Sequence, residues 1–164
     1  MRLIEGEIEV EDVDALLATF GDVSADTGAT VQAFDADYVV DREHLARAVE
    51  LADRAIERGE NVARDRAVEI LLYAAGRRQI DQALALGVDR GTTPAVVAVD
   101  GEREGEAVAA IREREWFVPG ETMGERDEAA IREFFGVSDA ERSATSADLA
   151  ALVVERVALL DIEK

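Results

Sequence analysis

The chain contains no cysteine, so disulfide bonds, thiolate nucleophiles and thiolate metal sites are all excluded. Aromatic residues make up only 5% of the chain, so its core must be built mainly from leucine, valine, isoleucine and alanine. No apolar run approaches the ~20 residues that a membrane-spanning helix requires. Where a signal peptide would be apolar, the N-terminal segment carries Glu5, Glu7, Glu9 and Glu11. We therefore expect a soluble, cytoplasmic protein that does not associate with membranes.

Basic residues are also scarce, because 18 Lys and Arg face 37 Asp and Glu, which gives a net charge of −19. The only lysine is Lys164. Such self-repulsion strains a compact fold in dilute buffer, but at ~1 M salt the Debye length falls to about 3 Å. An acidic, lysine-poor composition is typical of salt-accumulating archaea and predicts a halophilic source; the alternative is an acidic mesophilic protein. Because the charge reflects habitat, it does not exclude a nucleic-acid partner.

Motifs for common catalytic chemistries are missing from the sequence. It has no Walker loop, no G-x-G-x-x-G and no G-x-S-x-G. The single histidine, His44, is expected on a helix surface or in its cap region, with no serine nearby. Acidic clusters such as Glu125, Asp127 and Glu128 are expected to be solvated faces, since none has EF-hand spacing. We predict no catalytic residues, metal ion, cofactor or small-molecule substrate; a carboxylate enzyme that uses a divalent ion remains an alternative.

The hydrophobic pattern predicts an α/β (α+β) fold, in which helices pack on a small mixed or antiparallel sheet within a single domain over residues 1–164. We expect strands over residues 3–10, 29–40, 95–99 and 157–162. We expect helices over residues 12–20, 41–59, 65–75, 77–86, 104–115 and 123–135. Thr145 or Ser146 is expected to cap a last helix, and residues 21–28 are expected to form a loop.

One segment has features beyond those of a scaffold. A helix is expected to end on Ala74-Ala75-Gly76, and the next is expected to begin at once with Arg77, Arg78 and Gln79. Gly76 can adopt the left-handed conformation that ends a helix, and the small residues allow a ligand to approach closely. The two arginines and the free N–H groups of the new helix would then face one spot, as an anion site requires. The alternative is a glycine-capped corner with two solvated arginines.

The string EILLYAAGRRQIDQAL, residues 69–84, resembles the small subunit of the KEOPS complex, the CGI/TPRKB (PRPK-binding protein) family, here of a haloarchaeal type. Upstream, Ala36-Asp37-Tyr38-Val39 followed by His44 supports the resemblance, as does the order of elements. The resemblance implies a small α/β fold without catalytic residues. It also implies binding to the small atypical kinase (an ATPase) of KEOPS, a complex that installs threonylcarbamoyl on the adenosine next to the tRNA anticodon.

The resemblance further implies that the subunit recruits tRNA by holding its single-stranded 3′ CCA end. The residues to which this role maps are Gly76, Arg77, Arg78, Gln79 and Ile80. Two other hypotheses remain open at this stage. The chain could bind the kinase without contacting tRNA, or it could be a structural or regulatory α/β domain unconnected with KEOPS.

Overall fold

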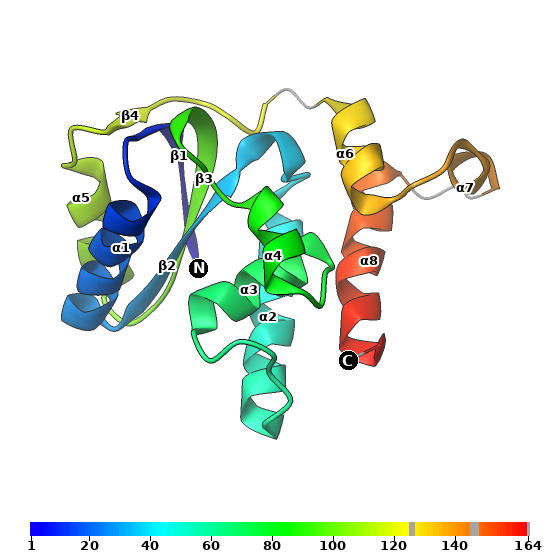
Figure 1. Cartoon of the computed structure of the whole chain (residues 1–164), viewed down its shortest axis with the longest axis horizontal. Helices are drawn as coiled ribbons and strands as arrows, with labels where there is room; N and C mark the ends of the chain where they lie inside the picture. The colour runs from blue at the N-terminus through cyan, green and yellow to red at the C-terminus, as the bar shows by residue number, and fades with distance from the viewer. Residues whose placement is uncertain (125–126, 145–147, 164) are drawn as a thin grey trace. The chain divides into compact units, whose positions relative to one another are not determined.

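The computed structural model describes residues 1–124, 127–144 and 148–163 (Figure 1). The chain divides into two compact units, each formed by two segments. The sheet unit comprises Met1–Ala36 and Gly87–Gly124, and the helical unit comprises Asp37–Leu86 and Glu125–Lys164. The fold class is confirmed, because helices accompany a small sheet whose strand pairs are all antiparallel.

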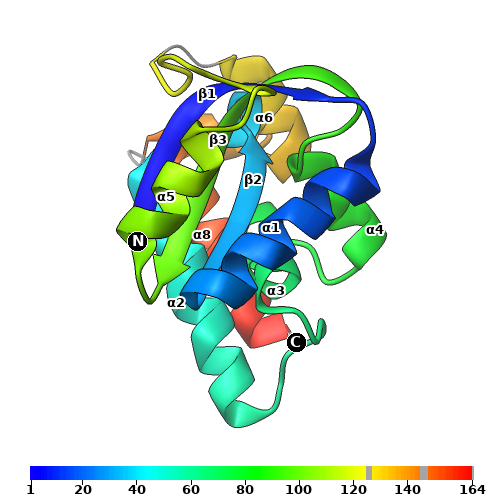
Figure 2. The same cartoon turned by 90° about the vertical axis from the view of Figure 1, so that its left-hand side faces the viewer.

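The sheet unit contains four strands in its described residues, in the order β2-β3-β1-β4. Their bounds are β1 Arg2–Val10, β2 Ala29–Asp35, β3 Gly91–Gly101 and β4 Phe117–Pro119. In the central pair of strands, β1 and β3, Ile4 lies opposite Val97. On the other side of β3, Ala33 of β2 also lies opposite Val97. Figure 2 shows α1 (Val13–Thr27) and α5 (Glu104–Arg112) on one face of this sheet, where Phe20 and Ile111 join its core.

Helix α1 corrects the expectation of a loop over residues 21–28. It begins after Asp12, whose carboxylate accepts from the N–H groups of Asp14 and Ala15, and it ends at Gly28, whose φ is 81°. Its buried residues recur at helical spacing through the segment expected to be a loop: Leu16, Phe20, Val23 and Thr27. The helix therefore continues through Gly21 because burial of the later residues outweighs the modest helix propensity of glycine.

The helical unit contains six α-helices in its described residues. Their bounds are α2 Arg42–Arg58, α3 Arg66–Ala75, α4 Ile80–Ala83, α6 Glu128–Phe135, α7 Asp139–Ala144 and α8 Leu149–Glu163. Helices α2, α3 and α8 pack on one another, and α6 packs on α8. The sequence predicted α2 closely, since the Asp41 carboxylate accepts from the His44 N–H at its start and Gly59, with φ 71°, ends it.

The strand expected over residues 157–162 is wrong, because this segment continues helix α8. The buried residues of α8 recur at three- and four-residue spacing: Leu149, Leu152, Val153, Val157 and Leu160. The cap expected at Thr145 or Ser146 lies outside the described residues. In the described part of this region, the Asp148 carboxylate accepts from the Ala151 N–H at 2.8 Å.

The remaining differences concern the ends of elements and two short elements, α7 and β4, that the sequence did not predict. The strand expected over residues 29–40 ends at Asp35 and is followed by a 3₁₀ turn, Ala36–Tyr38. The helix expected over 104–115 ends at Arg112, and β4 was not predicted. Asp127 caps α6 by accepting from the Ala130 N–H, while Glu128 is exposed; Glu125 lies outside the described residues. Within the described residues, no helix combines the length and apolar character that crossing a bilayer requires.

Candidate functional site

The corner after α3 has the geometry that the Ala-Ala-Gly sequence predicts. Gly76 has φ 63° and ψ 33°, which lie in the left-handed region. Its N–H donates to the Tyr73 carbonyl oxygen at 3.0 Å, and the Arg77 N–H donates to the Leu72 carbonyl oxygen at 3.1 Å. This pair of bonds is the Schellman motif, which satisfies carbonyl groups at the end of a helix and turns the chain sharply.

The two arginines of the corner have different environments. Arg77 is half-buried; its Nη2 donates to the Phe134 carbonyl oxygen, and its Cζ lies 5.3 Å from the centroid of the Phe134 ring. Arg78 is exposed, and among the described residues it has no hydrogen bond or ion pair. Arg77 therefore joins the corner to α6, whereas Arg78 is available to a ligand.

The helix expected to start at Arg77 or Arg78 begins later, at Ile80, and its α-helical part ends at Ala83. A 3₁₀ turn, Leu84–Leu86, follows. Four residues cannot sum to a sizeable helix dipole, so the expected group of free N–H donors is weaker than the sequence implied. Gln79 precedes this helix and accepts from the Gln82 Nε2 at 3.0 Å instead of capping it. Arg78 therefore supplies the main positive charge at the corner.

Apolar and aromatic side chains accompany this charge. Ile80 and Leu84 are 41% and 56% exposed and lie one helical turn apart. Tyr38 packs against Phe134 with a centroid distance of 4.9 Å. Sequence reasoning missed Phe134 as part of the corner, since the contact joins positions 57 residues apart. The sequence contains no local signal for that contact.

His44 lies behind the corner and is fully buried, so its expected place on a helix surface is wrong, although it does lie in the cap region. Its Nε2 donates to the Ala74 carbonyl oxygen at 2.7 Å, and its Nδ1 accepts from the Val40 N–H at 3.3 Å. Burial lowers the pKa of His44 to about 4, against smaller opposing effects of the Ala74 hydrogen bond and the Asp41 charge. The neutral ring joins the start of α2 to the end of α3, two residues before Gly76.

Helix α8 supports the same region. The Tyr73 hydroxyl donates to the Asp161 carboxylate at 3.0 Å, and burial, followed by this hydrogen bond, raises the pKa of Tyr73 above its usual value. Arg156 donates to the carbonyl oxygens of Phe135 and Gly136 and pairs with Glu141 at 2.5 Å. Within residues 1–124, 127–144 and 148–163, no group of three or more histidine and carboxylate side chains is arranged to hold a metal ion.

A family model described as kinase binding protein CGI-121 matches residues 9–161. The chain belongs to the CGI-121 family. The match covers the Gly76 corner and almost the whole chain, so the resemblance found in residues 69–84 is confirmed at the level of the family. As the description states, CGI-121 proteins bind a kinase. No curated protein matches the chain.

This CGI-121 chain offers a matched pair of glycines that tests the backbone of the corner. Gly76 and Gly59 both end helices with left-handed φ, 63° and 71°. A Cβ on Gly76 would meet the Arg156 carbonyl oxygen at an ordinary 3.5 Å, and a Cβ on Gly59 would meet nothing within 4 Å. Gly76→Ala and Gly59→Ala should therefore each lower the free energy of unfolding by about 1–2 kcal/mol, from backbone strain alone. Denaturant titration checks this; a much larger loss for Gly76→Ala would contradict it.

Proposed function

We propose that this chain is a non-catalytic, cytoplasmic subunit of the KEOPS complex that acts as one domain. In this proposal it binds the small atypical kinase (ATPase) of the complex and recruits tRNA by its 3′ CCA end for threonylcarbamoyladenosine modification. The observation that carries the kinase part is membership of a kinase-binding family over residues 9–161. The non-catalytic part is supported by His44, whose two ring nitrogens are both engaged by the backbone of a buried site.

The tRNA part is supported by the chemistry of the corner. Arg78, Gln79 and Ile80 are exposed side by side, after a glycine turn that leaves little side-chain bulk. Affinity that comes from phosphate neutralisation falls steeply with salt, and this acidic chain has no excess of basic residues to provide it. A single-stranded end can instead be bound by stacking and by hydrogen bonds to base edges, which an arginine, a glutamine and apolar side chains can supply.

We expect Arg78→Ala to weaken binding of full-length tRNA by about tenfold or more at ~1 M KCl, where long-range charge effects are screened. The matched control is Arg64→Ala, because Arg64 is also exposed, has no partner among the described residues and precedes the other end of α3. The measurement is a binding titration with tRNA and with tRNA that lacks its 3′ CCA. Equal losses for the two variants, or affinity that does not depend on the CCA end, would contradict the tRNA part.

One observation favours a kinase-binding subunit that does not contact tRNA. Arg77 already bonds to Phe134, so the corner offers one free arginine instead of two. In that case neither tRNA would bind in the titration, while the kinase would still bind. The two functions are therefore separable in a single preparation of the protein.

For the kinase, exposed apolar side chains are the first candidates for contacts, since buried aliphatic and aromatic anchors dominate most protein interfaces. Ile162 of α8 is 79% exposed, more than the other exposed large apolar side chains of the described residues. We expect Ile162→Asp to weaken kinase binding by about tenfold or more. Leu17→Asp is the control, because Leu17 is 50% exposed on α1 of the other unit. Calorimetric titration with the purified kinase checks this, and unchanged affinity for Ile162→Asp would exclude that surface.

A further inference from the structure

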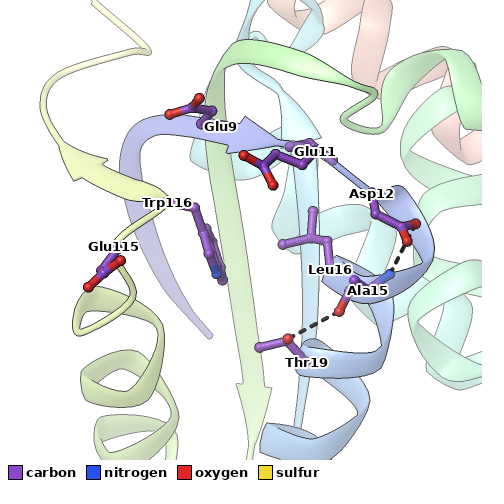
Figure 3. A pocket seen from close by; sticks show the side chains of 9 residues that line it. Glu9, Glu11, Asp12, Ala15, Leu16, Thr19, Glu115 and Trp116 are labelled. Atoms are coloured by element: carbon purple, nitrogen blue, oxygen red, sulfur yellow. Dashed lines mark hydrogen bonds between the residues drawn. The ribbon is translucent and has the colours of Figure 1, made fainter.

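The sheet unit contains a hollow of about 490 Å³ that none of the functions above uses (Figure 3). It is formed by the end of β1, the start of α1 and the turn that precedes β4. Figure 3 shows Trp116 and Leu16 on either side of the space, Glu9 and Glu11 near one end, and Thr19 near the other. The volume falls within the range of about 300–1,000 Å³ in which proteins bind small groups.

One wall of the hollow is a fixed aromatic surface. Trp116 is the only tryptophan of the chain and is half-buried. The Phe20 ring packs edge-on against it with a centroid distance of 6.2 Å, and the Trp116 carbonyl oxygen accepts from the Glu9 N–H at 2.9 Å. The face of an indole attracts cations more strongly than that of any other aromatic side chain. Contacts to both the ring and the backbone of Trp116 therefore hold this wall in place.

The rim of the hollow carries negative charge without compensation. Glu9, Glu11 and Glu115 are exposed, and in the described part of the chain none of their carboxylates has a hydrogen bond or an ion pair. Elsewhere on this protein arginines do pair with surface carboxylates, as Arg66 does with Asp53. No arginine lines the hollow. Carboxylates around a concave, partly apolar surface concentrate a negative potential there.

We propose that this hollow binds the guanidinium group of an arginine side chain presented by a partner protein. A guanidinium ion can stack on the indole of Trp116 while its edge N–H groups donate to Glu9 and Glu11. An inorganic cation fits less well, since no three carboxylates of the described residues are arranged to hold a metal ion and the Trp116 wall suits a flat organic cation. Free arginine fits less well too, because its own carboxylate would be repelled by three glutamates, whereas a peptide carries an uncharged amide in that place. The proposal is independent of the tRNA and kinase functions.

Because Trp116 is the only tryptophan, its fluorescence reports directly on the hollow. The probe is the peptide acetyl-Gly-Arg-Gly-amide, and its control contains citrulline, which has the shape of arginine without the charge. Both are titrated at one fixed ionic strength. We expect a saturable change in emission with the arginine peptide, none with the citrulline peptide, and weaker binding of free arginine.

The double substitution Glu9→Gln and Glu11→Gln should weaken binding of the arginine peptide by about tenfold or more. Glu7→Gln, on the same strand but outside the lining, should leave it unchanged. If the double variant unfolds, Glu115→Gln alone should still weaken binding severalfold, since Glu115 lies on an exposed turn. The site would be overturned by any of three results: equal binding of the citrulline peptide, an equal loss with Glu7→Gln, or no saturable change in emission. If free arginine bound more tightly than the peptide, the ligand would not be an arginine side chain of a partner protein.

Discussion

The stability of this protein should fall by about 3 kcal/mol, from His44 alone, as the pH decreases from 7 to below 4. The pKa of His44 is about 4 in the folded chain against 6.5 for an exposed histidine, and each pKa unit corresponds to ~1.4 kcal/mol. Because the folded pKa is the lower one, the unfolded chain binds the proton first. The contribution of His44 is therefore complete above about pH 6.5 and is lost as the pH falls through this window towards 4.

His44→Gln separates this effect from the titration of the many carboxylates. The glutamine Nε2 can still donate to the Ala74 carbonyl oxygen, but the side chain does not titrate, and the Val40 N–H loses its acceptor. We expect the variant to be less stable at pH 7 by about 1–3 kcal/mol and to depend less on pH between 6.5 and 4. Denaturant titrations at several pH values in ~1 M KCl measure both quantities. If the free energy of unfolding depended on pH equally in the original protein and in His44→Gln, the effect could not be assigned to His44.

Removing the Glu69 carboxylate should lower the free energy of unfolding by at least as much as the protonation of His44. Glu69 is fully buried in α3, and its two oxygens accept from the Val62 N–H at 3.0 and 3.1 Å and from the Ala63 N–H at 3.1 Å. These bonds hold the segment between α2 and α3 against the first turn of α3. A hydrogen bond to a charged group is worth about 1.5–3 kcal/mol, and an orphaned buried N–H adds a desolvation penalty. We expect Glu69→Ala to lower the free energy of unfolding by about 3–5 kcal/mol.

Two further variants make this prediction specific. Glu69→Gln retains one acceptor oxygen at nearly the same size, so it should lose about half as much stability. Glu57→Ala removes an exposed carboxylate from α2 and should change stability by less than about 0.5 kcal/mol. Hydrogen exchange should also accelerate at the Val62 and Ala63 amides in Glu69→Ala. Slow exchange at both amides in that variant would show that other contacts hold the segment.

Local signals in the sequence predicted helix α2 and the Gly76 corner well. The stripe of apolar residues, the Asp41 cap and the glycine at position 59 all act within a few residues of one another, so their effect can be estimated without the rest of the chain. The same holds for Gly76, whose left-handed conformation follows from the end of α3. Which family the chain resembles was also contained in this local string.

Helix α3 shows how the same reasoning fails. The sequence predicted a helix over residues 65–75, but not that every residue from Glu69 to Ala75 would be buried. Because these residues are covered on all sides, an amphipathic pattern cannot predict which of them are buried. The apolar run at residues 157–162 has the same ambiguity, because a short apolar segment suits a strand and a buried helix equally well. In α3 the surrounding elements determined which residues are buried, and at residues 157–162 they determined that the segment is helical.

The sequence by itself determined the fold class, the caps of α2 and the position of the Gly76 corner, because short-range periodicity and backbone preference set each of them. The string at residues 69–84 indicated the family. Only the tertiary structure decided which side chains the corner can use. Arg77 bonds to Phe134, 57 residues away, and His44 bonds to Ala74, 30 residues away. The acidic hollow beside Trp116 likewise joins the ends of separate elements. Contacts between distant positions depend on how the elements pack, which no local pattern of residues specifies.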